Sequence, residues 1–180
     1  IVQIYSVGWL DDVLHIAMEF IDGASLAKLM QDQGRIAWKH ALDFGHQVAS
    51  ALECAHASQV IHRDVKLTNI LIDPHGRAYV TDFGIAKILT ADTQLTVQGE
   101  RLGTPQYMAP ERFGGSELTP SSDLYSLGVV LFQLISGRLP YEAQSQVELI
   151  KKITSDPPAR LRDFVPSVPE DVERLVAYLI

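Results

Sequence analysis

The chain has 180 residues, of which 47% are hydrophobic and 21% charged, so its length and composition indicate one globular domain rather than a disordered or fibrous chain. The formal net charge is -7 and the 15 lysines and arginines are scattered, which argues against a nucleic-acid or anionic membrane surface. The single cysteine excludes an internal disulfide and a cysteine-based zinc site and suits a reducing cytosolic setting, and no run of about 18 apolar residues encodes a membrane span.

The first part of the chain predicts two strands and two helices. The apolar stretches IVQIYSV and VLHIAMEF, separated by Gly-Trp-Leu-Asp-Asp, are typical of an antiparallel strand pair. A short helix is expected over residues 25–34, and an apolar stripe predicts a longer helix over residues 41–57. Within that helix we expect Cys54 to be a small buried residue rather than a reactive one.

The stretch VIHRDVKLTNILI, residues 60–72, sets two apolar runs around a polar group. Each run has the composition of a short buried strand, so the polar residues are expected on a loop between strands. The stretches NILI and AYVT flank Asp-Pro-His-Gly, a turn signal that predicts a β-hairpin. Residues 90–103 are polar and aperiodic, which predicts a long exposed loop of a kind that is usually functional when it is not disordered.

Helical patterns dominate the rest of the chain. The apolar spacing over residues 121–136 predicts a helix that is buried nearly all round and stopped by Gly137. Further helices are expected over residues 146–154 and after Ser167, where Ser167 and Glu170 form a capping-box pattern. Strands come first and helices follow, so the order of elements predicts an α+β arrangement with a dominant helical part.

An aspartate and a lysine on a loop are most often a solvated salt bridge, but here the polar grouping continues along the chain. Asn69 lies five residues after Asp64, and Asp82 follows the hairpin with Phe83 directly behind it. The stretches HRDVKLTN, TDFGIAK and GTPQYMAPE, in this order, resemble the motif set of the protein kinase family, and SDLYSLGVVLFQLISGRLPY is similar to the buried helix that follows them. The resemblance covers essentially the whole chain.

The resemblance implies an α+β fold: a protein-kinase-like C-terminal lobe, mainly helical with a small β-hairpin, after the last strands and hinge of a truncated N-terminal lobe. We expect residues 1–23 to be the end of that N-lobe and residues 24–180 to be the C-lobe, truncated at its C-terminal end. The family's Gly-rich loop, strand lysine and partner helix glutamate are missing, because no GxGxxG occurs and the first lysine is Lys28. We therefore expect these 180 residues alone to show little or no transfer.

The resemblance assigns catalytic and metal-binding roles in phosphoryl transfer, a reaction that asks mainly for positioning and charge stabilisation. Asp64 is expected to orient the attacking hydroxyl and accept its proton, and Lys66 to place a positive charge beside the transferring phosphoryl group. Thr104 resembles the threonine that bridges this base and lysine in serine/threonine kinases. Asn69 and Asp82 are expected to supply oxygen ligands to Mg²⁺, for which Mn²⁺ could stand in.

The resemblance also places the ATP adenine between the two lobes. Met18 is expected to gate an inner pocket, the backbone of the hinge to hydrogen-bond the adenine edge, and an apolar side chain to lie beneath the ring. The residues expected to bind the nucleotide are Met18, Glu19, Phe20, Ile21 and Leu71.

Arg63 precedes the expected base, which in the family marks enzymes whose activation loop is ordered when a phosphate on the loop pairs with this arginine. Thr93 and Thr96 are the favoured phosphosites in that loop, and a merely polar flexible loop fits either threonine at least as well. In the family the residues matching His62 and Phe83 stack as packing residues.

Further structural roles also come from the family. The buried helix carboxylate Asp123 is expected to hold the catalytic loop by its backbone, and Glu111 to pair with an arginine beyond the last matched helix. Leu67 stands where the family commonly has proline. The histidines other than His62 show no ligand-like spacing and are expected on the surface or as caps; they are His15, His40, His46, His56 and His75.

The sequence thus predicts the catalytic region of a serine/threonine protein kinase of bacterial style, which transfers the γ-phosphoryl of ATP to a Ser or Thr hydroxyl of a protein. Its expected partners are ATP, a protein substrate and, for autophosphorylation, a second copy; no nucleic acid and no membrane contact are expected from this segment. We expect a cytoplasmic location, with a membrane anchor outside these residues left open. A pseudokinase-like scaffold is disfavoured by the intact Asp64, Lys66, Asn69 and Asp82, and a small-molecule phosphotransferase by the threonine-containing loop and the APE segment.

Overall fold

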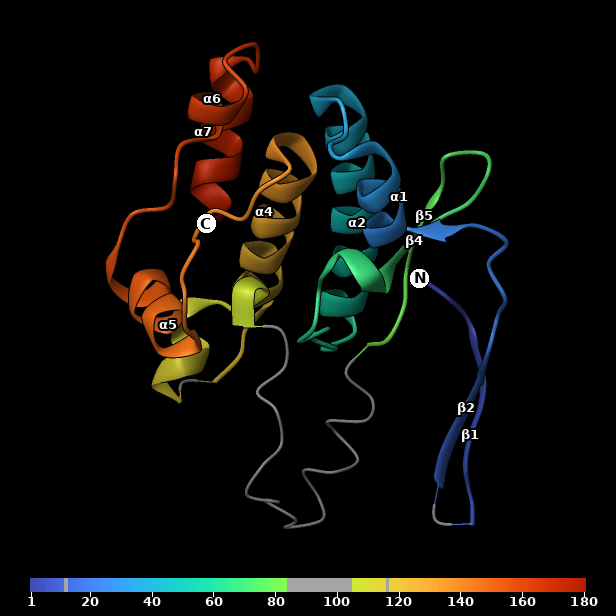
Figure 1. The fold of residues 1–180 in the computed structure, drawn as a ribbon. Helices are drawn as coiled ribbons and strands as arrows, with labels where there is room; N and C mark the ends of the chain where they lie inside the picture. Colours follow the sequence, from blue (N-terminus) through green and yellow to red (C-terminus); the bar gives the residue numbers. More distant parts are fainter. Residues whose placement is uncertain (12, 84–104, 116) are drawn as a thin grey trace.

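The computed structural model describes residues 1–11, 13–83, 105–115 and 117–180. Figure 1 shows α2 and α4 side by side at the centre, with α6 and α7 beyond α4 and the strands on the opposite side. The helices are α1 (Leu26–Gln33), α2 (Trp38–Ala57), α4 (Pro120–Ser136), α5 (Gln146–Ser155), α6 (Leu161–Phe164) and α7 (Glu170–Leu179), and the short 3₁₀ helices are η1 (Leu67–Asn69), η2 (Pro105–Tyr107) and η3 (Pro110–Gly114). The mainly helical α+β fold predicted from the sequence is confirmed.

The strands form two antiparallel sheets. β1 (Ile4–Leu10) pairs with β2 (Val13–Met18) in a hairpin that extends away from the helices in Figure 1. The second sheet has the order β3 (Ala24–Ser25), β4 (Ile70–Ile72) and β5 (Ala78–Val80). Both predicted hairpins are confirmed, although Gly8, Trp9 and Leu10 continue β1 instead of forming the predicted turn.

The strand predicted at residues 60–61 is wrong. Val60 donates its backbone N–H to the carbonyl of Ala55 at 2.9 Å, so this part of the chain closes the end of α2 instead of pairing with a strand. Val60 is also 40% exposed, which a buried strand residue would not be. The polar residues that follow therefore lie on a loop between a helix and a strand.

Local signals explain where the helices begin and end. The hydroxyl of Ser25 accepts from the backbone N–H of Lys28 at the start of α1, and Gly34 ends that helix with a φ of 76°. α4 begins with a capping box between Thr119 and Ser122. The capping box predicted for Ser167 and Glu170 is wrong, because the N-cap of α7 is Pro169, which makes no side-chain cap.

The main hydrophobic core lies between α2 and α4 and extends to the segments that surround these two helices. α4 is buried nearly all round, as predicted, and it packs against α2 and α7 in one core. Fully burying one such side chain stabilises the fold by about 1.5–3 kcal/mol. The largest fully buried side chains of this core are Phe132, Leu26, Leu52, Ile70, Leu134, Ile135 and Leu161.

One buried position was predicted wrongly. Cys54 is exposed on α2, whose core-facing residues include Leu52 and Ala55. Cys54 lies two residues from Leu52, which in a helix places it on the opposite side.

Among the helices of the described ranges, none combines the length and apolar character needed to cross a membrane.

Candidate functional site

The loop after α2 is held by a carboxylate of α4. Asp123 is 1% exposed, and it accepts hydrogen bonds from the backbone N–H of His62 at 2.8 Å and from that of Arg63 at 2.9 Å. It also lies 2.8 Å from Nε2 of His56. His56 is therefore a partly buried partner of this carboxylate, and its predicted surface or cap position is wrong. These contacts give Asp123 the geometry expected of a residue that fixes the loop backbone.

Asp64, Lys66 and Asn69 form one hydrogen-bonded cluster. Lys66 Nζ lies 2.7 Å from Asp64 Oδ2, and both side chains are 22% exposed. The amide nitrogen of Asn69 donates to the backbone carbonyl of Asp64 at 2.9 Å and to its carboxylate at 3.2 Å. Because the Asn69 nitrogen faces Asp64, its carbonyl oxygen is the end that can meet a cation.

The buried ring of His62 connects this cluster to the segment that carries Asp82. Its Nδ1 accepts from the backbone N–H of Asp64 at 3.2 Å, so its Nε2 carries the proton and donates to the Thr81 carbonyl at 3.0 Å. Thr81 in turn donates its N–H to the Asn69 carbonyl at 3.0 Å. Asp82 thus directly follows Thr81, which is hydrogen-bonded to the loop of Asp64. The side chain of Asp82 itself is exposed.

Two of these residues have left-handed backbone conformations. The φ angle is 68° at Arg63 and 59° at Asp82. Such angles are uncommon in residues other than glycine and persist only where surrounding contacts hold them. Asp11 and Gln59 also have positive φ angles, so the conformations of Arg63 and Asp82 agree with a functional site here but do not identify it by themselves.

The residues expected to bind a nucleotide lie at the end of β2 and on β4. Glu19 donates its N–H to the carbonyl of Gln3 at 2.8 Å, so a ligand at this residue would use the Glu19 carbonyl. The hydroxyl of Thr81 lies 3.7 Å from the sulfur of Met18, which places Met18 near the segment of Asp82. The Phe20 side chain is 86% exposed, and that of Ile21 is partly buried.

Leu71 is partly buried on β4, between Ile70 and Ile72, which are both in the core. Because side chains alternate along a strand, Leu71 faces away from the core that they fill.

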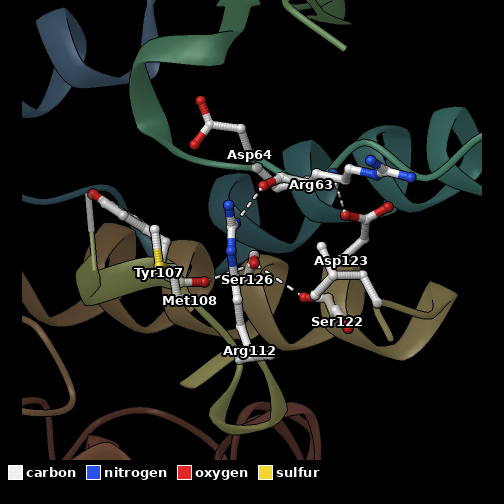
Figure 2. Close-up of a pocket in the computed structure, with 11 residues that line it drawn as sticks. Arg63, Asp64, Tyr107, Met108, Arg112, Ser122, Asp123 and Ser126 are labelled. Atoms are coloured by element: carbon white, nitrogen blue, oxygen red, sulfur yellow. Dashed lines mark hydrogen bonds between the residues drawn. The ribbon is translucent and has the colours of Figure 1, made fainter. Parts of the chain in front are cut away.

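A second set of contacts joins η3 to this loop. Glu111 accepts a hydrogen bond from the hydroxyl of Ser122 on α4, and no arginine contact to Glu111 is found among the described residues. Arg112 Nη1 donates to the backbone carbonyl of Arg63 at 2.9 Å, as Figure 2 shows. Sequence reasoning missed Arg112, because an arginine beside Glu111 carries no local signal of a contact with a loop 49 residues earlier.

An open groove lies beside Lys66, between α1, η1 and the end of α4, with a volume of about 590 Å³. Gln133 on its wall accepts a hydrogen bond from the Tyr107 hydroxyl. Burial raises the pKa of Tyr107 to about 12, with the bond to Gln133 opposing the shift. The described lining residues include Gln31 and Thr68 and no carboxylate. Sequence reasoning did not predict this groove, which forms only when four segments meet, from α1, η1, η2 and the end of α4.

Three of the predicted site residues lie outside the described residues. They are Thr93, Thr96 and Thr104, together with the predicted loop over residues 90–103. Their roles stay predictions.

The backbone of the loop is held by a buried carboxylate of a helix, and a Thr-Asp-Phe segment follows the loop in sequence. This arrangement is that of a phosphotransferase with a kinase fold. The chain belongs to the protein kinase family: the family model described as protein kinase domain matches residues 1–180. Members of this family use ATP and a divalent metal ion.

Among known proteins, the chain is similar to bacterial serine/threonine-protein kinases. It is 41% identical over 177 residues to PrkC of Bacillus subtilis, covering 98% of this chain and 27% of that protein. It is 40% identical over 162 residues to PknA of Mycobacterium tuberculosis, covering 90% and 37%. It is 35% identical over 176 residues to a probable kinase PknB of Lactococcus lactis, covering 98% and 28%. The chain thus spans between about a quarter and two fifths of these relatives.

Proposed function

We propose that this chain is the catalytic region of a protein kinase that transfers the γ-phosphoryl of ATP to a serine or threonine hydroxyl of a protein substrate. The observation that carries the proposal is the hydrogen-bonded cluster of Asp64, Lys66 and Asn69, with the backbone next to Asp82 bonded to the same loop. Phosphoryl transfer needs such a fixed arrangement more than it needs covalent chemistry from the protein.

Asp64 orients the attacking hydroxyl and accepts its proton. Lys66 and Asn69 both donate to its Oδ2 oxygen, at 2.7 and 3.2 Å, which holds the carboxylate in place before a substrate arrives. Lys66 keeps positive charge beside the place where negative charge gathers on the transferring group, and at 22% exposure that charge is only partly screened. In serine/threonine kinases a threonine bridges the two, which supports Thr104 as a third member of this site.

Asn69 and Asp82 are the proposed ligands of the metal ion, most simply Mg²⁺, with Mn²⁺ as an alternative. The donor set fits such an ion, because an amide oxygen and a carboxylate are hard oxygen ligands and Asn69 turns its oxygen away from Asp64. When bound, the metal ion would neutralise charge on the phosphate oxygens. Met18, the backbone of residues 19–21, and Leu71 are the proposed adenine contacts.

The groove beside Lys66 supports a protein substrate. Its volume of about 590 Å³ is large enough for a side chain of an extended peptide, and Lys66 itself lies on its wall. A peptide bound in the groove would therefore place a neighbouring residue near Asp64.

Arg63 is the proposed receiver of a phosphate on the activation loop, at Thr93 or Thr96. Its Nε is buried and has no hydrogen-bond partner among the described residues, which favours an anion beside the guanidinium. A second copy of the protein is the proposed kinase that transfers that phosphoryl group from ATP to the threonine hydroxyl. We place the reaction in the cytoplasm, where ATP is available.

The test uses the full protein that carries these residues, with Mg²⁺ and ATP. We expect phosphate on serine and threonine but not on tyrosine of a generic protein substrate, and loss of at least about 100-fold in kcat for both Asp64→Asn and Asp82→Asn. Asp171→Asn, a change at an 84% exposed residue of α7, is the control and should leave kcat unchanged.

Two results would oppose the proposal. Unchanged kcat in Asp64→Asn would contradict the catalytic assignment. A full protein that binds partners but transfers no phosphate under any condition would favour a scaffold. The 180 residues alone contain no Gly-rich loop and are expected to show little or no transfer.

A further inference from the structure

Arg112 reaches from η3 to the loop that carries Asp64. Its guanidinium donates a 2.9 Å hydrogen bond to the backbone carbonyl of Arg63, in a partly buried position (Figure 2). A hydrogen bond from a charged donor is stronger than one between neutral groups, and partial burial strengthens it further. The bond therefore couples η3 physically to the catalytic loop.

The Arg63 carbonyl is the oxygen end of the peptide group that precedes Asp64. The nitrogen end of the same group is the Asp64 N–H, which donates to Nδ1 of His62 at 3.2 Å. A peptide group is planar, so contacts at its oxygen and at its hydrogen together fix its orientation. That orientation sets the direction in which the Asp64 side chain leaves the backbone.

The backbone conformation of Arg63 also needs hydrogen bonds to hold it. Its φ of 68° is a left-handed value that a side chain with a Cβ rarely adopts. Asp123 holds the Arg63 N–H at 2.9 Å, and Arg112 holds its carbonyl at 2.9 Å. Removing either contact takes away one of the restraints that keep this conformation.

We propose that Arg112 is a positioning residue, which acts through the Arg63–Asp64 peptide group to aim the Asp64 carboxylate at the attacking hydroxyl. The inference rests on the proposed kinase function. Arg112 contacts a backbone carbonyl, so it supports Asp64 without touching the reacting atoms. Because Glu111, the preceding residue, is hydrogen-bonded to Ser122 of α4, the position of η3 is itself fixed, and Arg112 transmits that position to Asp64.

The test compares Arg112→Gln and Arg112→Lys with Arg174→Gln in the full protein. Arg174 is a matched control, because its guanidinium is 71% exposed on α7 and, within the described part of the chain, pairs with the surface residue Asp171. We expect Arg112→Gln to lower kcat by about 10- to 100-fold with the KM for ATP unchanged, since a catalytic group misplaced by about 1 Å loses rate on this scale. Arg112→Lys, which keeps a charged donor, should recover part of that loss, and Arg174→Gln should lose nothing.

A second background shows whether Arg112 acts through Asp64. In Asp64→Asn, the added change Arg112→Gln should lower the residual rate no further, because the group that it positions is already gone. Amide hydrogen exchange at residues 62–64 should become faster in Arg112→Gln, while exchange in the centres of α2 and α4 stays the same. That readout needs no catalytic activity.

The outcomes separate this inference from the function on which it rests. Normal kcat in a folded Arg112→Gln protein, beside an inactive Asp64→Asn protein, would overturn the role of Arg112 alone. The role of Arg112 would also be overturned if Arg112→Gln lowered kcat in the Asp64→Asn background by as large a factor as in the wild type. An Asp64→Asn protein as active as the wild type would instead overturn the proposed function.

Discussion

The imidazole of His62 lies 4.5 Å, centroid to centroid, from the phenyl ring of Phe83. The same imidazole accepts from the Asp64 N–H and donates to the Thr81 carbonyl. One buried ring therefore contacts the residues on both sides of the site, the loop of Asp64 and the segment of Asp82. The geometry works only while the ring is neutral, because Nδ1 must be free of a proton to accept.

A pH dependence follows from this ring. Burial lowers the pKa of His62 below its usual value, and the Thr81 carbonyl and the carboxylates of Asp123 and Asp64 oppose that shift. The neutral His62 ring contributes its full stabilisation above the pKa that it has in the unfolded chain, about 6.5. This stabilisation is lost as the pH falls through the lower pKa of His62 in the folded protein. We expect the free energy of unfolding in urea to fall as the pH drops below about 6.5, by at most about 1.4 kcal/mol for each unit by which the pKa is lowered.

The control for this dependence is a second histidine. His62→Asn keeps a donor and an acceptor but removes the titrating group, so its unfolding free energy should vary less with pH. His75, exposed in the turn of the β4–β5 hairpin, should keep the wild-type slope when it is changed to Asn. Equal slopes for the two variants would show that another group carries the effect.

Asp123→Ala should be strongly destabilising. The carboxylate is 1% exposed and accepts from two backbone N–H groups and from the ring of His56, so its removal leaves buried donors without a partner. We expect a loss of about 3–5 kcal/mol in the free energy of unfolding, measured by urea titration. Asp171→Ala, at a residue whose side chain is 84% exposed, should change it by no more than about 0.5 kcal/mol. If Asp123→Ala lowered the free energy of unfolding by as little as Asp171→Ala does, other contacts would have to hold the loop.

Asn69→Asp tests the division of roles between Asn69 and Asp64. The change keeps an oxygen for the metal ion but replaces a nitrogen that lies 3.2 Å from the Asp64 carboxylate with a second negative oxygen. Two carboxylates at such a distance cannot both ionise easily, so the pKa of the pair rises. We expect the acid limb of the kcat profile to move to higher pH by about 1 unit or more.

Asn69→Ala is the matched variant for this measurement, since it loses the oxygen and the donor without adding charge. It should be less active than the wild type at every pH, with no displaced limb. An unshifted profile for Asn69→Asp would argue that Asp64 does not titrate as the base.

Regular helices and strands could be predicted because their periods are visible in the sequence, and α1, α2, α4, α5 and α7 all lie where their patterns indicate. β3, with two residues, and α6, with four, are too short to show a period. Cys54 was misplaced because its residue type was given more weight than its position on α2, where the stripe of Leu52 and Ala55 already faces the core.

The chain order of the motifs located Asp64, Asn69 and Asp82, because each motif is contiguous. The contacts that unite them are not contiguous: Asp123 meets Arg63 across 60 residues and Arg112 meets it across 49. Such pairs carry no local signal, since their partners are set by how α4 and η3 pack. Arg112 and the groove beside Lys66 could therefore be found only in the structure.

The groove beside Lys66 makes a prediction about the substrate. None of the described residues that line it is acidic, and Lys66 contributes positive charge, so a basic side chain gains nothing there. Gln133→Glu adds a carboxylate to the wall and still accepts the hydrogen bond from the Tyr107 hydroxyl, so the packing is kept. We expect the variant to prefer peptides with an arginine near the phosphorylated residue over matched glutamine peptides, with kcat/KM changed by about 2- to 5-fold, the scale of one partly exposed charge pair.

The measurement compares kcat/KM for arginine and glutamine peptides in the wild type and in Gln133→Glu. Glu148, partly exposed on α5 and outside the groove, supplies the control: Glu148→Gln removes a carboxylate elsewhere and should leave the preference as it is. Salt should weaken the new preference, because screening acts on a partly exposed pair. If Gln133→Glu treats both peptides as the wild type does, the side chains of the substrate do not enter this groove and the peptide lies elsewhere on the lobe.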